Sequence, residues 1–465
     1  MKINYLILVL LFEILGQSIY AKVLLPSIFS DNIVLQQQSK VFIWGKSDTG
    51  KEVSITSSWN KKTISVAVDK TGTWKAAIET PIAGGPYELV ISDGEEVRLK
   101  NILIGEVWLC SGQSNMDIPL AGVPNIALIK DANQYILNSN NSNLRFFTVD
   151  SSTGKDKLSF RGKWLVSNPE SAAKFSAVGY LFAKQLQEHL NTPVGIIKCA
   201  RSGTKIESWM SEKLLKDEFG ISTDEKTPNA KPAELFETMV MQIAGYGIKG
   251  FLWYQGEGNH RAYELYSRQL PAMVKEWRNQ WGMGDVPFYF AQLAPYDTKN
   301  GLLPYMRQAM AECVKTIPNS SIVILTDAGE ENNIHPIDKK TVADRFLYLA
   351  LAKTYQQKGF GYCGPIFKSL ELNKNEAIVS FDYAESGLTS YGKELVNFEI
   401  AGKDTVYVRA NAKLTKEGKV VVWSDSVKEP IGVRYAFKDF VVGELYNFMG
   451  LPASTFQSIM KISKN

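Results

Sequence analysis

The pattern of hydrophobic and polar positions changes twice along the chain. Between residues 22 and 102, short apolar alternations recur between turn signals such as Asp93-Gly94. Several short strands with this punctuation are typical of a β-sandwich. From residue 103 to about 364, apolar runs alternate with amphipathic stretches, which predicts strands joined by helices in a parallel sheet. From residue 365 to 465 the β alternation returns, either as a separate C-terminal β-rich region or as strands added to the first.

Within the α/β region, apolar runs predict the strands and amphipathic stretches predict the helices. The expected strands are the run that begins at Ile104, then residues 144–147, 194–199, 251–254, 287–293 and 322–325. The expected helices are residues 175–190, about 262–280, about 306–315 and about 339–355.

One segment imitates a nucleotide-binding motif. Residues 245–250 spell G-x-G-x-x-G. A dinucleotide-binding turn must follow a strand and open a helix. Here the segment precedes the strand 251–254, so the sequence predicts no dinucleotide cofactor.

Four of the expected strands lead into polar segments. These segments carry, in chain order, Ser114, Gly203, Asn259 and His335. In an open α/β sheet the carboxyl ends of the strands form the ligand-binding edge. We therefore expect the four residues to lie close together.

These four residue types are the parts that acyl transfer requires. An imidazole takes the proton of a serine hydroxyl and later returns it, which makes the hydroxyl a competent nucleophile. Hydrogen-bond donors must face the developing oxyanion, and removing one such donor costs about 2.7–4 kcal/mol. The N–H groups of Ser114 and Gly203 and the side-chain amide of Asn259 could serve. Glycine at position 203 lets the backbone approach without a Cβ atom.

The chain contains three histidines, which narrows the choice of base. His189 falls at the end of an expected helix, where the helix dipole favours it. His260 directly follows Asn259 and is a secondary candidate. His335 lies in a loop rich in acids and amides and precedes Pro336. Its place in the ordered set of four makes it the expected base.

The same motifs resemble those of the sialate O-acetylesterase family, which belongs to the SGNH hydrolases. The matching segments are Gly112-Gln113-Ser114-Asn115-Met116, Gly203-Thr204 with Glu207 and Trp209, residues 253–259 and Ile334-His335-Pro336. Residues 24–37, 433–436 and 450–454 also resemble family segments, so the resemblance covers nearly the whole mature chain. It implies an SGNH-type parallel sheet flanked by helices, and a reaction that needs no metal or organic cofactor.

Carried onto this chain, the resemblance implies Ser114 as the nucleophile and His335 as the base. It implies Gly203 and Asn259 as oxyanion donors beside the Ser114 amide. Further residues are expected around the substrate. Gln113 and Gln255 would shape the acetyl pocket, and Glu257 would brace its turn through hydrogen bonds. Cationic side chains that could pair with a sialic acid carboxylate are Arg201, Lys205 and Arg261.

The chain departs from the family pattern at three places. Ser202 stands where the family usually has the first glycine of Gly-Gly-Thr, so its side chain could crowd the oxyanion hole or add a hydroxyl to it. Gly258 replaces the serine of Gly-Glu-Ser-Asn. Many SGNH enzymes have an aspartate shortly before the histidine, where this chain has Asn332 and Asn333.

The group that orients His335 is therefore open. A backbone carbonyl, an asparagine oxygen or a nearby carboxylate could hold its second nitrogen. The nearby carboxylates in the sequence are Asp327, Glu330 and Glu331. Replacing the acid by an amide lowers the rate by about 10⁴-fold in a serine protease, because it fixes the wrong tautomer. The site is thus either a Ser-His dyad or weakly active.

The first 21 residues are typical of an export signal, which predicts a periplasmic or extracellular protein. Lys2 supplies the positive start, residues 5–12 are apolar, and residues 16–21 are mostly small or polar. No other stretch approaches the roughly 18 apolar residues that span a bilayer. A net charge of +4 over 465 residues does not indicate a nucleic acid partner. The oligomeric state stays open.

The cysteine pattern gives no sign of a metal site. The four cysteines, Cys110, Cys199, Cys313 and Cys363, lack C-x-x-C spacing, so zinc is not expected. Cys110 and Cys199 each end an expected strand, where a small buried side chain is the expected role.

The sequence thus predicts an exported carbohydrate O-acetylesterase that uses Ser114 and His335. The resemblance implies O-acetylated sialic acids as substrates. Two alternatives are an acetylesterase for a plant polysaccharide such as xylan or pectin, and a carbohydrate-binding protein with a weakened catalytic site. The missing aspartate and Ser202 motivate the second alternative.

Overall fold

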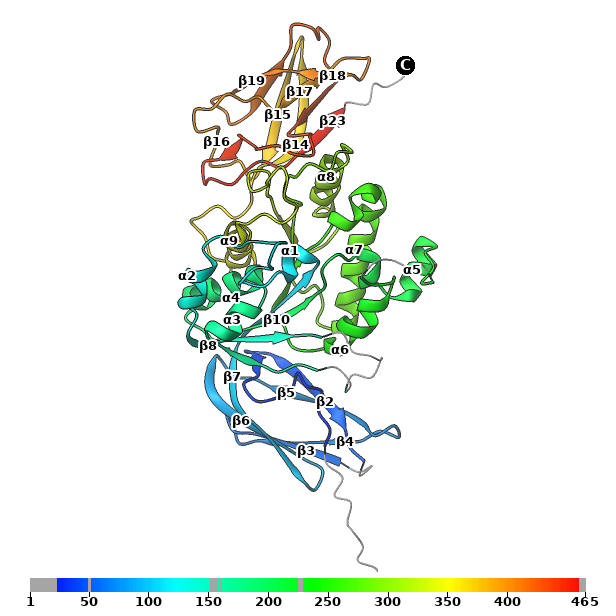
Figure 1. The fold of residues 1–465 in the computed structure, drawn as a ribbon, viewed down its shortest axis with the longest axis vertical. Coiled ribbons are helices and arrows are strands. Elements are labelled where there is room, and N and C mark those ends of the chain that lie inside the picture. Colours follow the sequence, from blue (N-terminus) through cyan, green and yellow to red (C-terminus); the bar gives the residue numbers. More distant parts are fainter. Residues whose placement is uncertain (1–22, 49–51, 151–157, 159–160, 225–228, 460–465) are drawn as a thin grey trace, which may run out of the picture.

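The computed structural model describes residues 23–459 except 49–51, 151–157, 159–160 and 225–228. The expected export signal, residues 1–21, lies outside this part. The molecule is elongated, with a β region at each end and an α/β region between them (Figure 1). The two β regions are therefore far apart and do not form one module.

The N-terminal β region consists of two small layers, in which all pairs are antiparallel except that β1 runs parallel to β7. Its strands are β1 (Val34–Gln36), β2 (Lys40–Lys46), β3 (Glu52–Ser57), β4 (Thr63–Ala67), β5 (Thr73–Glu79) and β6 (Gly84–Ser92). Strands β4, β3 and β6 pair in sequence with the first part of β7, and β2 pairs with β5 in a separate sheet. Inward-facing residues such as Val53 and Ile55 alternate with more exposed ones along β3, as the sequence pattern predicts.

Strand β7 (Glu96–Gly112) joins this region to the central sheet. It is 17 residues long and is continuously buried from Ile102 to Gly112. Its first part pairs antiparallel with β6, and its second part pairs parallel with β10 and β11. The domain boundary expected at residues 102 and 103 therefore falls inside one unbroken strand.

The central sheet has the order β13-β12-β11-β7-β10-β8-β9. Its other strands are β8 (Asn141–Thr148), β9 (Leu165–Ser167), β10 (Val194–Ala200), β11 (Gly250–Tyr254), β12 (Phe288–Ala291) and β13 (Ser320–Val323). All neighbours in this path are parallel except β8 and β9. The predicted strands are confirmed, although β13 begins and ends two residues before the expected range.

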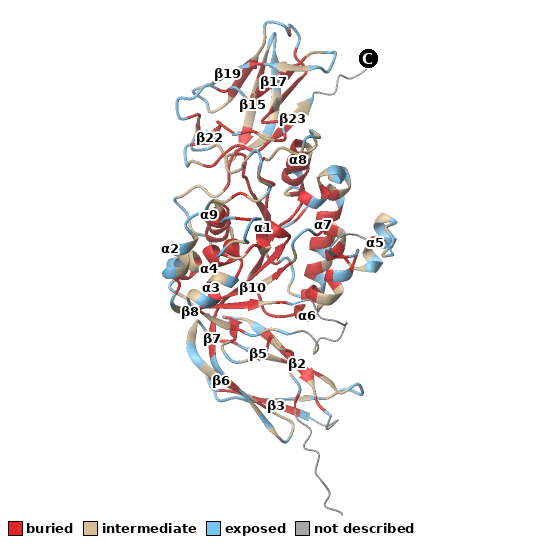
Figure 2. Cartoon of the chain, in the orientation of Figure 1, coloured by how far each residue is buried: buried red, intermediate tan, exposed pale blue. Residues whose placement is uncertain are grey.

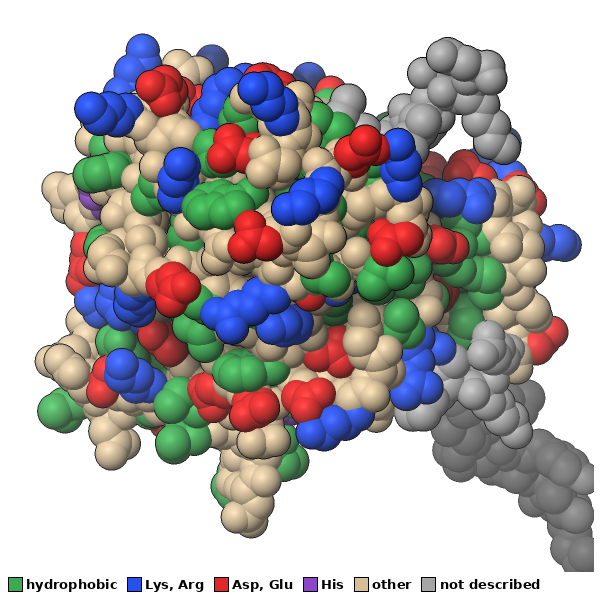
Figure 3. Space-filling view, turned by 90° about the horizontal axis from the view of Figure 1, so that it is seen from above, with side chains coloured by type: hydrophobic (Ala, Val, Ile, Leu, Met, Phe, Trp, Pro, Cys, Tyr) green, Lys and Arg blue, Asp and Glu red, His purple; other side chains and the backbone are tan. Residues whose placement is uncertain are grey.

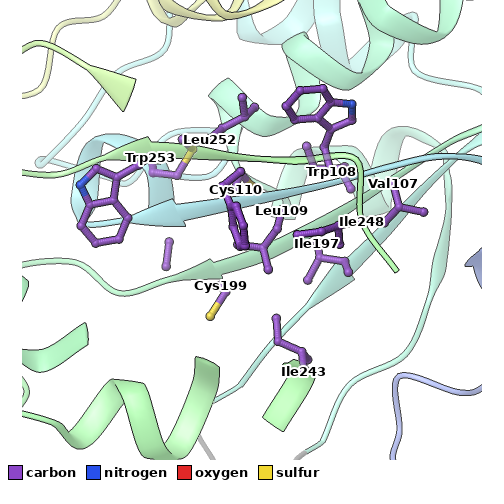
Figure 4. Close-up of a cluster of buried hydrophobic side chains, with 14 of the residues drawn as sticks. Val107, Trp108, Leu109, Cys110, Ile197, Cys199, Ile243, Ile248, Leu252 and Trp253 are labelled. Carbon is purple, nitrogen blue, oxygen red and sulfur yellow. The ribbon is translucent and has the colours of Figure 1, made fainter. Parts of the chain in front are cut away.

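Helices cover both faces of the sheet. Trp108 of β7 packs edge-on against Phe182 of α4 (Ala177–Leu190), and α4 packs beside α9 (Lys339–Leu349). On the other face, Trp253 of β11 packs against Trp277 of α7 (Tyr263–Trp281), which neighbours α8 (Leu303–Cys313). Figure 4 shows the buried side chains of β7, β10 and β11 between these layers.

The remaining helical segments are short. They are α1 (Ser114–Asp117), α2 (Ala132–Leu137), α3 (Pro169–Lys174), α5 (Glu212–Phe219), α6 (Met241–Ile243), the 3-10 helices η1 (Ile206–Trp209) and η3 (Glu257–Ala262), and the π-helices η2 (Phe236–Val240) and η4 (Ala350–Thr354). The helix expected over residues 339–355 is thus α9 continued by η4.

The C-terminal β region has a hydrophobic core of its own. Its strands are β14 (Ile366–Asn373), β15 (Glu376–Asp382), β16 (Leu388–Thr389), β17 (Phe398–Ala401), β18 (Tyr407–Arg409), β19 (Asn411–Leu414), β20 (Val420–Trp423), β21 (Gly432–Tyr435), β22 (Tyr446–Asn447) and β23 (Phe456–Ile459). Two four-stranded antiparallel sheets, β14-β15-β20-β19 and β18-β17-β21-β23, enclose the core. Figure 2 shows buried residues along the strands of this region.

A buried arginine attaches this region to the α/β region. Arg307 of α8 is fully buried and donates to the carbonyl of Ala436 at 3.2 Å and to the Oγ1 of Thr455 at 2.9 Å. Asp439 in turn accepts from the backbone N–H of Gly301 at 2.9 Å and of Leu303 at 3.1 Å. These contacts fix the C-terminal region onto the loop that leads into α8.

The surface carries charges of both signs, and the cysteines are buried. On the face shown in Figure 3, Lys and Arg side chains are interspersed with Asp and Glu side chains. The four cysteines are buried free thiols, as expected for Cys110 and Cys199. Burial raises the pKa of the Cys110 thiol to about 12. Within the described part of the chain, the helices are all too short or too polar to cross a membrane.

Candidate active site

The nucleophile lies at the end of β7. Gly112 has φ +137°, and a Cβ atom there would lie 2.1 Å from the carbonyl oxygen of Tyr254 on β11. The next residue, Gln113, donates its backbone N–H to that same carbonyl at 3.0 Å. Glycine therefore permits the close approach of the two strands just before Ser114. Ser114 opens α1 and is 8% exposed.

The structure brings His335 to this serine. The Nε2 atom of His335 lies 2.9 Å from the Oγ of Ser114. The His335 backbone N–H donates to the Oδ1 of Asn333 at 2.9 Å, which helps to fix the loop. Burial and the positive charge of Lys339 lower the pKa of the His335 imidazole. A neutral imidazole is the form that can accept the serine proton.

A backbone group orients the second nitrogen of His335. A hydrogen bond with the backbone of Ile126 acts to raise the pKa of the imidazole. A bond with that effect favours the protonated ring, so the ring donates and the Ile126 carbonyl accepts. Because Nε2 faces Ser114, the donor is Nδ1. Of the orienting groups that the sequence left open, a backbone carbonyl is therefore the one that this interaction favours.

The acidic candidates near His335 have other partners. Asp327 forms an ion pair with Arg345. Glu330 accepts from the backbone N–H of Ile337 at 2.8 Å and from the side-chain amide of Asn333 at 3.0 Å. Glu330 therefore holds the loop on both sides of the histidine.

Two further polar side chains of this loop extend to solvent. Asn332 and Glu331 are exposed. Nothing in the sequence marked Ile126, because a carbonyl acceptor does not depend on the side chain that carries it.

The turn after β10 carries Gly203 in a left-handed conformation, with φ +73°. Its carbonyl accepts from the side-chain amide of Asn229 at 3.1 Å. Ser202 donates its backbone N–H and its hydroxyl to Asp117 at 3.1 and 2.9 Å. The hydroxyl of Ser202 is therefore held by α1. Asp117 also pairs with Lys198 at 2.9 Å.

Asn259 is buried in η3 and its amide is fixed at both ends. Its Oδ1 accepts from the backbone N–H of Ile206 at 2.9 Å and from the Nε2 of Gln255 at 2.8 Å. Its Nδ2 donates to the carboxylate of Glu207 at 2.9 Å. The backbone contact of Oδ1 fixes the orientation of the amide, so that Nδ2 faces both oxygens of the Glu207 carboxylate.

The two glutamines expected around the acetyl group lie between the turns. Gln255 is fully buried and donates from Nε2 to the Oε1 of Gln113 and to the carbonyl of Thr204, both at 3.1 Å. Gln113 is also buried and accepts from the backbone N–H of Gly258 at 3.3 Å. These contacts join the turns of Ser114, Gly203 and Asn259. The two glutamine side chains therefore fix the positions of the three turns relative to one another.

Glu257 takes part in a buried network that the sequence did not indicate. Asn115 donates from Nδ2 to the carboxylate of Glu257 at 2.5 Å and to the carbonyl of Ile334 at 3.0 Å. Its Oδ1 accepts from the Nζ of Lys339 at 2.6 Å. Burial raises the pKa of Glu257. The predicted bracing role of Glu257 therefore passes through Asn115.

The other candidate residues have partners outside the pair of Ser114 and His335. His260 has both nitrogens engaged, by the Glu257 carbonyl and by the amide of Asn300, each at 2.8 Å. His189 contacts Gln357 at the end of α4. Arg201 donates its backbone N–H to Gly112 at 3.1 Å and is partly exposed.

Lys205 and Arg261 are exposed. Among the described residues, no cluster of three His, Cys, Asp or Glu side chains could hold a metal ion.

Comparison with known proteins shows which family the chain belongs to. The family model for SASA, described as carbohydrate esterase, sialic acid-specific acetylesterase, matches residues 104–357. The chain belongs to this family. It is therefore a carboxylic ester hydrolase, and the resemblance seen in its motifs is confirmed. The matched range begins within β7 and ends just after η4, so it covers every segment of the site described above.

Relatives of the SASA family extend the match beyond that range. The human sialate O-acetylesterase is 27% identical over 401 residues, which are 77% of this chain and 76% of that protein. The rat sialate O-acetylesterase is 27% identical over 446 residues, which are 80% of this chain and 81% of that protein. The crystal structure of a carbohydrate acetylesterase from Xanthomonas citri superposes with a TM-score of 0.85 at 30% identity, over 94% of this chain and 99% of that one.

Proposed function

We propose that the protein is an SGNH-type O-acetylesterase that removes acetyl groups from sugars through a Ser-His acyl-enzyme mechanism. The observation that carries this proposal is the 2.9 Å distance between Ser114 Oγ and His335 Nε2. Hydrogen-bond reach between a nucleophile and its base is the geometric signature of covalent catalysis. Membership of the SASA family supplies the reaction class.

In the first half of the reaction, Ser114 attacks the acetyl carbonyl while His335 takes the serine proton. The imidazolium then gives this proton to the departing sugar hydroxyl. In the second half, water attacks the acetyl-enzyme with His335 as base, and acetate leaves. A hydrogen bond from Nδ1 to the carbonyl of Ile126 would hold the ring in the tautomer that leaves Nε2 free to accept.

Three donors would stabilise the oxyanion, namely the backbone N–H groups of Ser114 and Gly203 and the side-chain amide of Asn259. The orientation of Asn259 by Glu207 supports its part, because a fixed donor needs no reorganisation during the reaction. Gly203 is suited to its part for two reasons. Its left-handed conformation favours glycine, and glycine has no Cβ atom beside the amide.

O-acetylated sialic acids are the proposed substrates. The human and rat relatives are named sialate O-acetylesterases. An acetylated plant polysaccharide such as xylan or pectin is the second candidate, because the Xanthomonas citri structure is described as a carbohydrate acetylesterase without restriction to sialic acids.

We also propose that the protein is exported to the periplasm or the cell exterior. The proposal rests on the apolar segment behind Lys2 at the start of the sequence.

The test compares the wild-type protein with Ser114→Ala on 4-nitrophenyl acetate, an O-acetylated sialic acid and acetylated xylan, following acetate release. We expect the substitution to remove turnover of all substrates that the wild type accepts. Turnover of sialate but not xylan supports the first substrate class, and the reverse supports the second. A rate in Ser114→Ala equal to that of the wild type would overturn the Ser-His mechanism.

A further inference from the structure

A buried lysine lies behind the proposed nucleophile and has no part in the mechanism above. Lys339 is the first residue of α9 and is only 2% exposed. Its Nζ donates to the Oδ1 of Asn115 at 2.6 Å. Burying an ammonium group is costly unless it is paired and hydrogen-bonded. A lysine at this position therefore calls for a role that an apolar side chain could not fill.

The hydrogen-bond partner of Lys339 connects the three parts of the site. Asn115 directly follows the nucleophile. Its Nδ2 donates to the carbonyl of Ile334, which directly precedes the base, at 3.0 Å. The same Nδ2 donates to Glu257, the first residue of the 3-10 helix that carries the proposed oxyanion donor Asn259, at 2.5 Å. One amide side chain therefore ties the three turns together.

The lysine determines how that amide is oriented. Glu257 and the Ile334 carbonyl both accept from the nitrogen of the Asn115 amide, and an ammonium group has donors only. The contact with Lys339 therefore fixes the oxygen on the opposite side. A charged donor makes a stronger hydrogen bond than a neutral one. Without it, the amide would lose the contact that opposes rotation.

Lys339 also acts on the base through its charge. Burial lowers the pKa of Lys339 to about 7, partly offset by the carboxylates of Glu257, Glu330 and Asp338. The ammonium is therefore charged below about pH 7, where His335 would otherwise become protonated. Its field and the burial of the ring both lower the pKa of His335.

We propose that Lys339 is a positioning residue of the esterase, which fixes Asn115 between the nucleophile and base turns. Its charge also acts against protonation of the His335 imidazole. The role rests on the proposed Ser114 and His335 mechanism. A merely structural lysine would affect the stability of the fold and leave the pH profile unchanged. The pH profile therefore separates the two roles.

The test substitutes Lys339→Met, with Lys340→Met as the matched control. Lys340 is the next residue of α9, and it pairs with Asp344 one turn along the helix. For each variant, kcat and KM for 4-nitrophenyl acetate are measured from acidic to neutral pH, and thermal unfolding checks the fold. The rate at which a fluorophosphonate labels Ser114, followed by mass spectrometry, reports activation of the serine without an acetyl substrate.

In Lys339→Met we expect kcat to fall on the order of 10-fold to 100-fold, because a displaced nucleophile or base loses its productive geometry. We expect the acid limb of kcat/KM to move to higher pH. Removing the positive charge raises the pKa of His335, and the reaction needs the neutral ring. Lys340→Met should retain the wild-type kcat and acid limb. Lys339→Arg, which keeps the charge, should retain the wild-type acid limb.

An unshifted acid limb and wild-type labelling rate in Lys339→Met would overturn the proposal. If Lys339→Met fails to fold, Lys339→Gln carries the same test, because it leaves an N–H donor without the charge. The wild-type protein decides independently by an NMR titration of its histidines. A His335 pKa at or above the ordinary value of about 6.5 would overturn the proposal without any variant. Failure of the proposed function is distinct, since it appears as absent Ser114-dependent turnover and labelling in the wild type.

Discussion

Asp327 accepts hydrogen bonds from both terminal nitrogens of Arg345, each at 2.7 Å. Arg345 lies on α9 and also donates to the carbonyl of Ile324 at 2.7 Å. The carboxylate and the guanidinium are 16% and 11% exposed. Asp327 was a candidate for orienting His335, and the structure uses it instead to join the end of β13 to α9.

Asp327→Asn should therefore destabilise the fold while leaving the chemistry nearly intact. We expect the free energy of unfolding to fall by about 3 kcal/mol, because the substitution leaves Arg345 largely buried and unpaired. We expect kcat to change less than about threefold, against the roughly 10⁴-fold loss when the acid of a catalytic triad becomes an amide. Denaturant unfolding and acetate release measure the two effects.

The control for this prediction is Asp344→Asn, which removes the partner of Lys340, a side chain of the same helix that is 48% exposed. It should change the free energy of unfolding by less than about 1 kcal/mol. A loss of kcat near 10⁴-fold in Asp327→Asn would show that the carboxylate reaches the base during the reaction.

Asn259→Ala should lower kcat by about 10²-fold to 10³-fold with little change in KM, because it removes a donor that acts in the transition state. Glu207→Gln should have a smaller effect, since glutamine still offers an oxygen to the Nδ2 of Asn259. Steady-state kinetics on one acetyl ester test both variants. A larger loss of kcat in Glu207→Gln than in Asn259→Ala would contradict the assigned donor.

Gly203→Ala should lose activity through two separable causes. A Cβ atom would lie 2.3 Å from the Nδ2 of Asn229, and alanine would have to adopt φ +73°. Adding Asn229→Ala removes the clash but not the conformational cost of about 1 kcal/mol or more. We therefore expect the double variant to recover part of kcat.

A double-mutant cycle on kcat measures the recovery. If the loss of kcat in the double variant equals the sum of the losses in the two single variants, the clash with Asn229 is contradicted.

Asp439→Ala should weaken the connection between the C-terminal region and the site. Asp439 holds the backbone of Gly301 and Leu303, and the adjacent Asn300 donates to His260. We expect unfolding to become easier by about 1–3 kcal/mol, the cost of leaving backbone donors unsatisfied. We also expect a reduced kcat.

His260→Ala is the matched comparison for Asp439→Ala, because it breaks the same connection nearer the site. It should reproduce the kinetic loss with a smaller change in unfolding free energy. Unchanged kinetics in both variants would show that the C-terminal region is attached without supporting the site.

The sequence predicted the elements that depend on local pattern. Strands such as β10 and helices such as α7 follow from apolar periodicity within a few residues, and their ends agree closely with the structure. The structure brings Ser114 and His335 together because both follow strands of one parallel sheet. Their spacing along the chain, 221 residues, carried no information about this contact.

What the sequence missed depends on tertiary contacts. In the sequence, Lys339 looks like any lysine at the start of a helix. Only its contact with Asn115 in the folded structure distinguishes it. Ile126 contributes a carbonyl, which every residue has. The boundary expected at residue 102 reflected a real change from alternating to continuous burial, but a strand can pass through such a change without ending.

The uninterrupted course of β7 has a consequence for how the protein unfolds. A strand of 17 residues spans about 55 Å, and it supplies backbone partners to the N-terminal sheet at one end and the central sheet at the other. Buried side chains from Val23 to Cys363 form one continuous core around it. We therefore expect the N-terminal β region and the α/β region to unfold in a single cooperative transition. Because β7 ends two residues before Ser114, we expect damage to the N-terminal strands to disturb the nucleophile.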